Sequence, residues 1–263
     1  MAEEPKRISV DGYEIAYVEA GQGEPVIFVH GGSQDYQMWT EQLPKFGARY
    51  RAIAYSRRNN YPNERSPEGT PNGAADVHGE DLAGLVRALG YSKARIVAHS
   101  SGAHAALFFA ATHPDMVVSL ALNEPPATGM LNGVPDGREI LKEFGGRLAA
   151  GREALKAGDV QRGIPLFVNG VGGPGNYERR SDADKKMNLE NVASHHADAT
   201  TKRPRAVFTC EMAERSRCES GMRSKPDMIP RSGVRLIKLT VRARSAHIVG
   251  CTQMRRGNLL TLG

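Results

Sequence analysis

The sequence has few cysteines, few aromatic residues and no long apolar run. Its 263 residues include 3 cysteines and 1 tryptophan, and aromatic residues make up 6%. The cysteines, Cys210, Cys218 and Cys251, lack metal-type spacing, and an odd, sparse set argues against a disulfide framework. No apolar stretch is long enough to span a bilayer, and the charged start MAEEPKR predicts no secretory signal. We therefore expect a cytoplasmic globular protein, and nothing here implies a metal, a cofactor or a membrane partner.

The net charge of +6 is unevenly distributed along the chain. From Lys202 onward there are 14 Lys and Arg against 4 Asp and Glu, whereas the preceding residues carry 21 against 25. The three cysteines lie in the same segment, so the composition changes near residue 200. A basic segment is typical of nucleic-acid binding, but this one lacks regular helical spacing and interleaved aromatics. We expect no nucleic-acid partner.

Apolar patterns in residues 1–126 alternate between strand and helix. A hairpin is predicted over 7–21, with Asp11-Gly12 as its turn. Short apolar strands are predicted over 25–29, 50–58, 94–100 and 117–126, and helices over 73–91 and 102–114. Strands that alternate with helices imply a parallel sheet, and near-continuous apolar strands fit burial on both faces. The expected fold class is α/β, with a mostly parallel, doubly wound sheet.

Residues 127–200 have a different pattern, with no convincing strand. Helices are predicted over 137–158, 159–169 and 181–199. This predicts a helical insertion that separates a first core part, 1–126, from a second, basic and atypical part, 201–263. In that second part, 235–241 and 244–250 are candidate strands, although 235–239 could equally end a helix.

A serine stands on a tight strand-to-helix corner at Ala98-His99-Ser100-Ser101-Gly102. Strand, small residue, x, Ser, x, small residue, helix is the nucleophile-elbow pattern, which raises the hydroxyl above the sheet edge. It also places the next backbone N–H at a helix N-terminus, where developing negative charge is favoured. The alternative is an ordinary turn in which serine caps the helix.

His30-Gly31-Gly32 also follows an apolar strand, about seventy residues before the serine corner. With the strands around it and the Ser100 corner, this stretch resembles the serine-nucleophile branch of the α/β-hydrolase family, similar to esterases and lactonases. The resemblance covers about 7–126, and 127–200 resembles the lid that this family inserts after its sixth strand. It implies an oxyanion hole formed by the N–H groups of Gly32 and Ser101, and a structural role for His30.

Ser100 needs a base and an orienting acid, which in this family follow in the order Ser, acid, His. Glu124 stands at the end of the sixth strand, although it could be a solvated carboxylate, and Asp227 is the alternative acid. His247 is the candidate base, but Gln253, which cannot act as a base, occupies the expected loop position. The remaining candidates are expected to be structural or surface histidines: His99, His104, His113, His195 and His196.

Several departures from the family pattern fall in the last sixty residues. These are Gln253, the basic excess, the clustered cysteines and the missing seventh strand before Asp227. One hypothesis unites them: this segment is read in a shifted frame or has diverged past function. Reading the codons of residues 247–257 two bases on permits a His-containing string similar to the family loop.

The expected function is hydrolysis of small carboxylic esters through Ser100 and an acyl-enzyme, with a small ester-like molecule as the partner. A lactone or a carbon–carbon bond would use the same groups. Epoxide hydrolases and dehalogenases usually carry Asp at the nucleophile position, so Ser100 argues against both. The alternative from another class is a non-catalytic ligand-binding protein of this fold, which Gln253 favours. The oligomeric state stays open.

Overall fold

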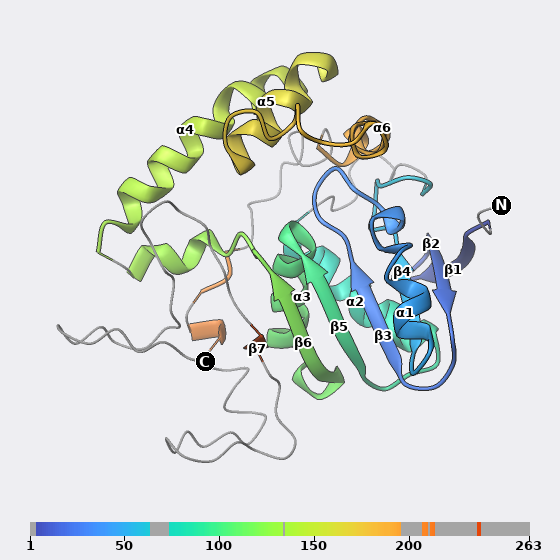
Figure 1. Ribbon diagram of the computed structural model, residues 1–263. Coiled ribbons are helices and arrows are strands. Elements are labelled where there is room, and N and C mark those ends of the chain that lie inside the picture. Colours follow the sequence, from blue (N-terminus) through green and yellow to red (C-terminus); the bar gives the residue numbers. More distant parts are fainter. Residues whose placement is uncertain are drawn as a thin grey trace.

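Seven strands form one sheet in the computed structural model, which describes residues 4–63, 74–133, 135–195, 207–209, 211–213 and 236–237. Their order across the described sheet is β1-β2-β4-β3-β5-β6-β7 (Figure 1). The strands are β1 (Lys6–Val10), β2 (Tyr13–Ala20), β3 (Pro25–Val29), β4 (Arg51–Tyr55), β5 (Ala94–His99), β6 (Val117–Asn123) and β7 (Leu236–Ile237).

The sheet is parallel except at its N-terminal edge. Strands β4, β3, β5, β6 and β7 pair in parallel, whereas β2 is antiparallel to both β1 and β4. The β1–β2 hairpin turns at Asp11 (φ 49°) and Gly12 (φ 80°), the two positive φ values that a tight two-residue hairpin turn favours. The predictions of the hairpin and of a mostly parallel sheet are confirmed.

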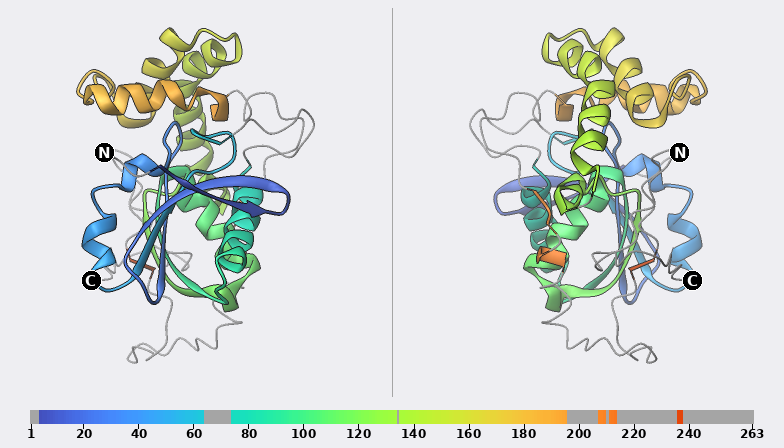
Figure 2. Two further views of the ribbon diagram at one scale, coloured as in Figure 1. Left: turned by 90° about the vertical axis from the view of Figure 1, so that its right-hand side faces the viewer. Right: turned by 90° about the vertical axis from the view of Figure 1, so that its left-hand side faces the viewer.

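Helices cover both faces of the sheet, because the apolar strands present side chains to each. On β3, Ile27 and Val29 face the larger core, against α2 (Ala75–Ala88) and α3 (Ser100–Thr112). Val26 and Phe28 face the smaller core, against α1 (Leu43–Gly47) and the short helix η1 (Tyr36–Trp39). Figure 2 shows α1 and the α2–α3 pair on opposite sides of the sheet. The doubly wound arrangement is confirmed.

Three longer helices follow β6: α4 (Gly137–Lys156), α5 (Val160–Gly172) and α6 (Asp182–Glu190), after the short η3 (Thr128–Gly133). Leu155, Ile164 and Val168 form a separate small core between α4 and α5. The two helices approach closely, since a Cβ on Gly151 would lie 2.6 Å from the backbone nitrogen of Phe167. Figure 1 shows α4–α6 beyond the carboxyl ends of the parallel strands. The helix predicted over 181–199 ends at Glu190, and residues 192–195 form a further helical turn.

Two residues of the predicted strand 235–241 lie within the described part of the chain. Leu236 and Ile237 pair in parallel with Leu120 and Ala121 of β6. The second candidate strand, 244–250, lies outside the described residues. Of the helices that the structure describes, none is both long and apolar enough to cross a membrane.

Candidate active site

Ser100 lies at an abrupt corner between a strand and a helix. Strand β5 ends at His99 and helix α3 begins at Ser100, whose φ of 49° is in the left-handed region that non-glycine residues rarely adopt. A Cβ on Gly102 would lie 2.3 Å from the carbonyl oxygen of His30, so a larger residue cannot fit beneath this turn. The corner therefore holds Ser100 in a strained conformation, and such strain is concentrated at functional sites.

The loop after β3 lies directly against this corner. A Cβ placed on Gly31 would be 3.2 Å from Ser100 Cβ, and one on Gly32 would be 3.6 Å from Ser101 Oγ. The two residues expected to supply the oxyanion hole, Gly32 and Ser101, are thus neighbours in space, although about seventy positions apart in the chain. Gly32 is exposed and Ser100 is half-buried, so a small molecule has access to the corner.

Arg57 ties the loop to the corner. Its Nη2 donates to the carbonyl oxygen of Gly31 at 2.9 Å and to Ser101 Oγ at 3.0 Å, so one guanidinium nitrogen bridges both segments. Its backbone N–H donates to His30 Nε2 at 2.9 Å, which leaves His30 Nδ1–H to donate to Gly31 O at 2.8 Å. Burial lowers the pKa of His30 well below its usual value, with the charge of Arg57 adding to this effect. His30 is therefore a neutral residue that shapes the loop.

Glu124 stands beside Ser100 at the same edge of the sheet. His99 and Asn123 pair as the last residues of the neighbouring strands β5 and β6, and Ser100 and Glu124 directly follow them. Adjacent strands lie about 5 Å apart. Glu124 is exposed and has a φ of 51°, like Ser100. The sequence placed it correctly at the strand end, but its role as the orienting acid stays a prediction.

The candidate base, His247, lies outside the described residues, as do the alternative acid Asp227 and Gln253. The prediction that His247 completes the site is therefore untested. The same holds for the hypothesis of a shifted frame or divergence in residues 201–263. His104 lies in α3 one turn after Ser100, and His113 follows the last residue of that helix. His99 ends β5 next to Ser100, and His196 lies outside the described residues.

The sequence predicts a surface position for His195, but in the structure this residue is half-buried beside the loop after β3. Its Nε2 is hydrogen-bonded to the side chain of Ser33, the residue after Gly32, and its ring packs edge-on against Phe167 at 4.7 Å. Burial lowers the pKa of His195 to about 4, with Arg57 a further cause, so the ring is neutral at pH 7. No signal in the nearby sequence predicts this position, because the partners Ser33 and Phe167 lie far from His195 in the chain.

Two buried asparagines join the same helical segment to the core. Asn188 Nδ2 donates to the carbonyl oxygen of Ser33 at 2.9 Å. Asn191 Nδ2 donates to Asp35 Oδ2 at 2.7 Å, and Asn191 Oδ1 accepts from the backbone N–H of Tyr61 at 2.8 Å. Burial raises the pKa of Asp35, and its bond to Asn191 opposes that rise. The loop that carries Gly32 is thus held from both sides, by Arg57 below and by α6 above.

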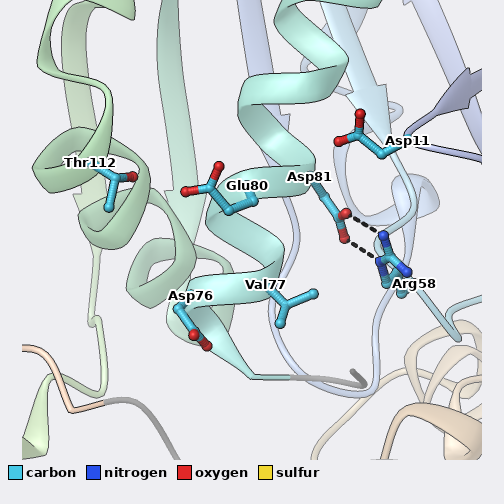
Figure 3. A pocket seen from close by; sticks show the side chains of 7 residues that line it. All are labelled: Asp11, Arg58, Asp76, Val77, Glu80, Asp81 and Thr112. Carbon is cyan, nitrogen blue, oxygen red and sulfur yellow. Dashed lines mark hydrogen bonds and ion pairs between the residues drawn. The ribbon is translucent and has the colours of Figure 1, made fainter. Parts of the chain in front are cut away.

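A separate pocket of about 420 Å³ lies on the α2–α3 face (Figure 3). Arg58 and Asp81 form a bidentate ion pair in it, with both hydrogen bonds at 2.7 Å. Its rim includes Thr112, at the opposite end of α3 from Ser100, and a helix of 13 residues is roughly 20 Å long. Neither Ser100 nor Glu124, the candidate catalytic residues that the structure describes, lines this pocket. Among the described residues, no cluster of three or more His, Cys, Asp or Glu side chains could hold a metal ion.

Comparison with known proteins agrees with this geometry. The sequence profile of the alpha/beta hydrolase fold matches residues 24–160, which is more than half of the chain. The chain therefore belongs to the α/β-hydrolase fold family.

Individual relatives share the same core. "Epoxide hydrolase 1" of Caenorhabditis elegans is 31% identical over 124 residues, covering 46% of this chain and 30% of the relative. The solved structure of the epoxide hydrolase CorEH superposes with a TM-score of 0.59 at 19% identity, covering 75% of this chain and 74% of that one. The lactone-degrading enzyme Est816 gives 0.58 at 22% identity, covering 77% and 73%. The alignments span about a third of the length of the curated relatives.

Proposed function

We propose that the protein hydrolyses small carboxylic esters, with Ser100 as the nucleophile. The observation that carries this proposal is the left-handed φ of Ser100 on a corner where Gly32 and Ser101 lie side by side. A serine hydroxyl needs both a raised position and hydrogen-bond donors that receive the oxyanion. The helical segment α4–α6 is proposed as the lid over this corner.

The proposed reaction follows from the roles of these groups. Ser100 Oγ attacks the ester carbonyl while its proton passes to a histidine, for which His247 is the candidate. The backbone N–H groups of Gly32 and Ser101 stabilise the oxyanion. The histidine then protonates the leaving alcohol, and water cleaves the acyl-enzyme by the same route. Glu124 would orient the imidazole, and a lactone would react through the same steps.

Relatives named as epoxide hydrolases raise the alternative of epoxide opening. Ser100 disfavours this reaction for a chemical reason. A carboxylate that opens an epoxide forms an ester, which water can cleave to release the diol. A serine oxygen would instead form an ether, which has no carbonyl for water to attack, so the enzyme would stop after one turnover. We therefore expect no diol from styrene oxide.

Hydrolysis of p-nitrophenyl acetate by Ser100→Ala tests the proposal. We expect the variant to lose at least about a thousandfold in kcat, because the nucleophile is removed while the oxyanion donors remain. A fluorophosphonate probe should label the wild-type chain on Ser100, as mass spectrometry of the tryptic peptide would report. Ser92→Ala, on an exposed serine outside the site, is the matched control and should keep full activity.

Two results would contradict the proposal. Equal rates for the wild type and Ser100→Ala would exclude Ser100 as the nucleophile, and release of diol from styrene oxide would favour the epoxide reaction.

His247→Gln tests the base separately. A loss of kcat similar to that of Ser100→Ala supports His247 as the base, whereas unchanged turnover assigns the base to another residue.

A further inference from the structure

A second cavity, of about 410 Å³, lies between the loop after β3 and the segment that joins α5 to α6. Its lining is polar and comes from both sides: Gln34 from the loop, and Asn176, Arg179, Arg180, Ser181 and Asp184 from the helical segment. It shares no lining residue with the acidic pocket on the α2–α3 face.

Gln34 connects this cavity with the serine corner. Its Oε1 accepts the backbone N–H of Gly31 at 3.1 Å, so the side chain is fixed against the loop. A Cβ on Gly31 would lie 2.6 Å from Gln34 Oε1 and 3.2 Å from Ser100 Cβ. Gln34 Oε1 and Ser100 Cβ thus both border the position that a Gly31 side chain would take, which places Gln34, a lining residue of the cavity, next to the serine corner.

Arg180 is held in position over this space. Its Nη1 donates to Asn188 Oδ1 at 2.8 Å, and Asn188 is itself buried and bonded to the carbonyl oxygen of Ser33. Burial lowers the pKa of His99, the residue before Ser100; the charge of Glu124 opposes this, and the charge of Arg180 adds to it. Arg180 is half-buried, and its Nη1 hydrogen bond goes to a neutral amide.

The other charged groups leave the cavity with a net positive charge. Among the described residues that line it, Asp184 is the one acidic residue, against Arg179 and Arg180. The Asp184 carboxylate accepts from Ser181 Oγ at 2.7 Å at the start of α6, where the N-terminal end of a helix favours negative charge. Arg179 is exposed and donates to the carbonyl oxygen of Pro174 at 3.3 Å, whereas Arg180 is linked through Asn188 to the loop after β3.

We propose that Arg180 binds a carboxylate of the substrate in this cavity, so that the preferred substrates are esters with a second, anionic group. The inference rests on the proposed function, and it adds the substrate class. Arg suits this task because its planar guanidinium donates two parallel hydrogen bonds to a carboxylate. The hydrogen bond to Asn188 holds the guanidinium in place before the substrate binds, which reduces the side-chain entropy lost on binding.

Two isosteric esters test the proposal by activity. Mono-p-nitrophenyl glutarate carries a carboxylate where p-nitrophenyl 5-methylhexanoate carries two methyl groups. In the wild type, kcat/KM should favour the glutarate ester. Arg180→Gln should lower kcat/KM for that ester about tenfold, mainly through KM, and affect the neutral ester much less. Arg138→Gln, on the exposed face of α4, removes the same charge outside the cavity and should change neither ester.

A binding measurement separates this proposal from the proposed function. By calorimetry, the wild type should bind glutarate about tenfold more tightly than the neutral glutaramide, and Arg180→Gln should abolish that difference. If both esters resist hydrolysis but this binding pattern holds, the ester-hydrolase proposal fails and the carboxylate site stands. If glutarate and glutaramide bind alike, or if Arg180→Gln and Arg138→Gln behave alike, the carboxylate site is overturned whatever the activity.

Discussion

At the scale of single residues, the site depends on how closely two backbone segments approach each other. Gly102 permits this approach because it has no side chain. The carbonyl oxygens of His30 and Val29 occupy the space that a side chain at this position would need. The strained φ of Ser100 persists because the surrounding packing holds it. A methyl group at position 102 would separate the β3 loop from the serine.

Gly102→Ala should lower the free energy of unfolding by about 2–4 kcal/mol, because the new Cβ would lie 2.3 Å from a backbone oxygen that cannot move easily. Esterase activity should fall with it, since Gly32 and Ser101 would be displaced. Gly146→Ala is the matched control: it lies in α4 with nothing within 4 Å of the added Cβ and should stabilise by about 0.5–1 kcal/mol. Urea unfolding of both variants measures this, and equal shifts would contradict the close-packing argument.

At the scale of elements, α6 and the turn after it hold the helical segment on the core through polar contacts. Asn188 and Asn191 are buried, at 1% and 0% exposure, and both bond to the loop after β3. A buried amide with all its partners specifies one position of a helix, whereas an apolar contact tolerates sliding. These contacts of Asn188 and Asn191 with the loop form a polar seam, which also positions Arg180. The geometry of the proposed substrate site therefore depends on this seam.

Asn191→Ala should destabilise the fold by about 2–4 kcal/mol, because it removes a partner from Asp35 and from the backbone N–H of Tyr61 in a buried setting. Asn132→Ala, on an exposed residue of η3, should change stability by no more than about 0.5 kcal/mol. Chemical denaturation of both variants provides the comparison. If Asn191→Ala lowers the free energy of unfolding no more than Asn132→Ala does, the hydrogen bonds of Asn191 contribute nothing to stability.

At the scale of the whole molecule, several histidines are held in the neutral form by full or partial burial. Burial lowers the pKa of His78, His104 and His195 to about 4 each, from an ordinary value near 6.5. Between pH 6.5 and 4 the unfolded chain therefore binds more protons at these positions than the folded chain. The free energy of unfolding should fall as the pH is lowered through this window, and it should not depend on these residues above pH 7.

We predict how much His104 contributes to the slope of the free energy of unfolding against pH. It packs against Phe108 in α3, with ring centroids 5.3 Å apart. His104→Gln should reduce the slope between pH 6.5 and 5 by up to about 1.4 kcal/mol per pH unit, the contribution of one proton. Urea denaturation at half-unit pH steps measures it. A slope that matches the wild type would show that His104 is not protonated on unfolding in this range.

The sequence predicted the core strands and helices because their signals are local. Apolar runs such as residues 25–29 and 94–99 are long enough to require burial on both faces, and Asp11-Gly12 favours one kind of turn. The Ser100 corner was found from five consecutive residues. His195 was misplaced because its burial depends on Ser33 and Phe167, which lie far from it in the chain. Nothing in its immediate sequence distinguishes such a histidine from one in solvent.

By itself, then, the sequence determined the α/β class, the order of the elements and the position of the serine corner, since periodicity and turn chemistry act over a few residues. The tertiary structure decided what surrounds the serine. The bridge made by Arg57, the seam made by Asn188 and Asn191, and the placing of Arg180 beside Gln34 join residues up to 156 positions apart. Such contacts exist only after the chain has folded, because close packing and the need to satisfy buried polar groups bring together side chains that no local pattern connects.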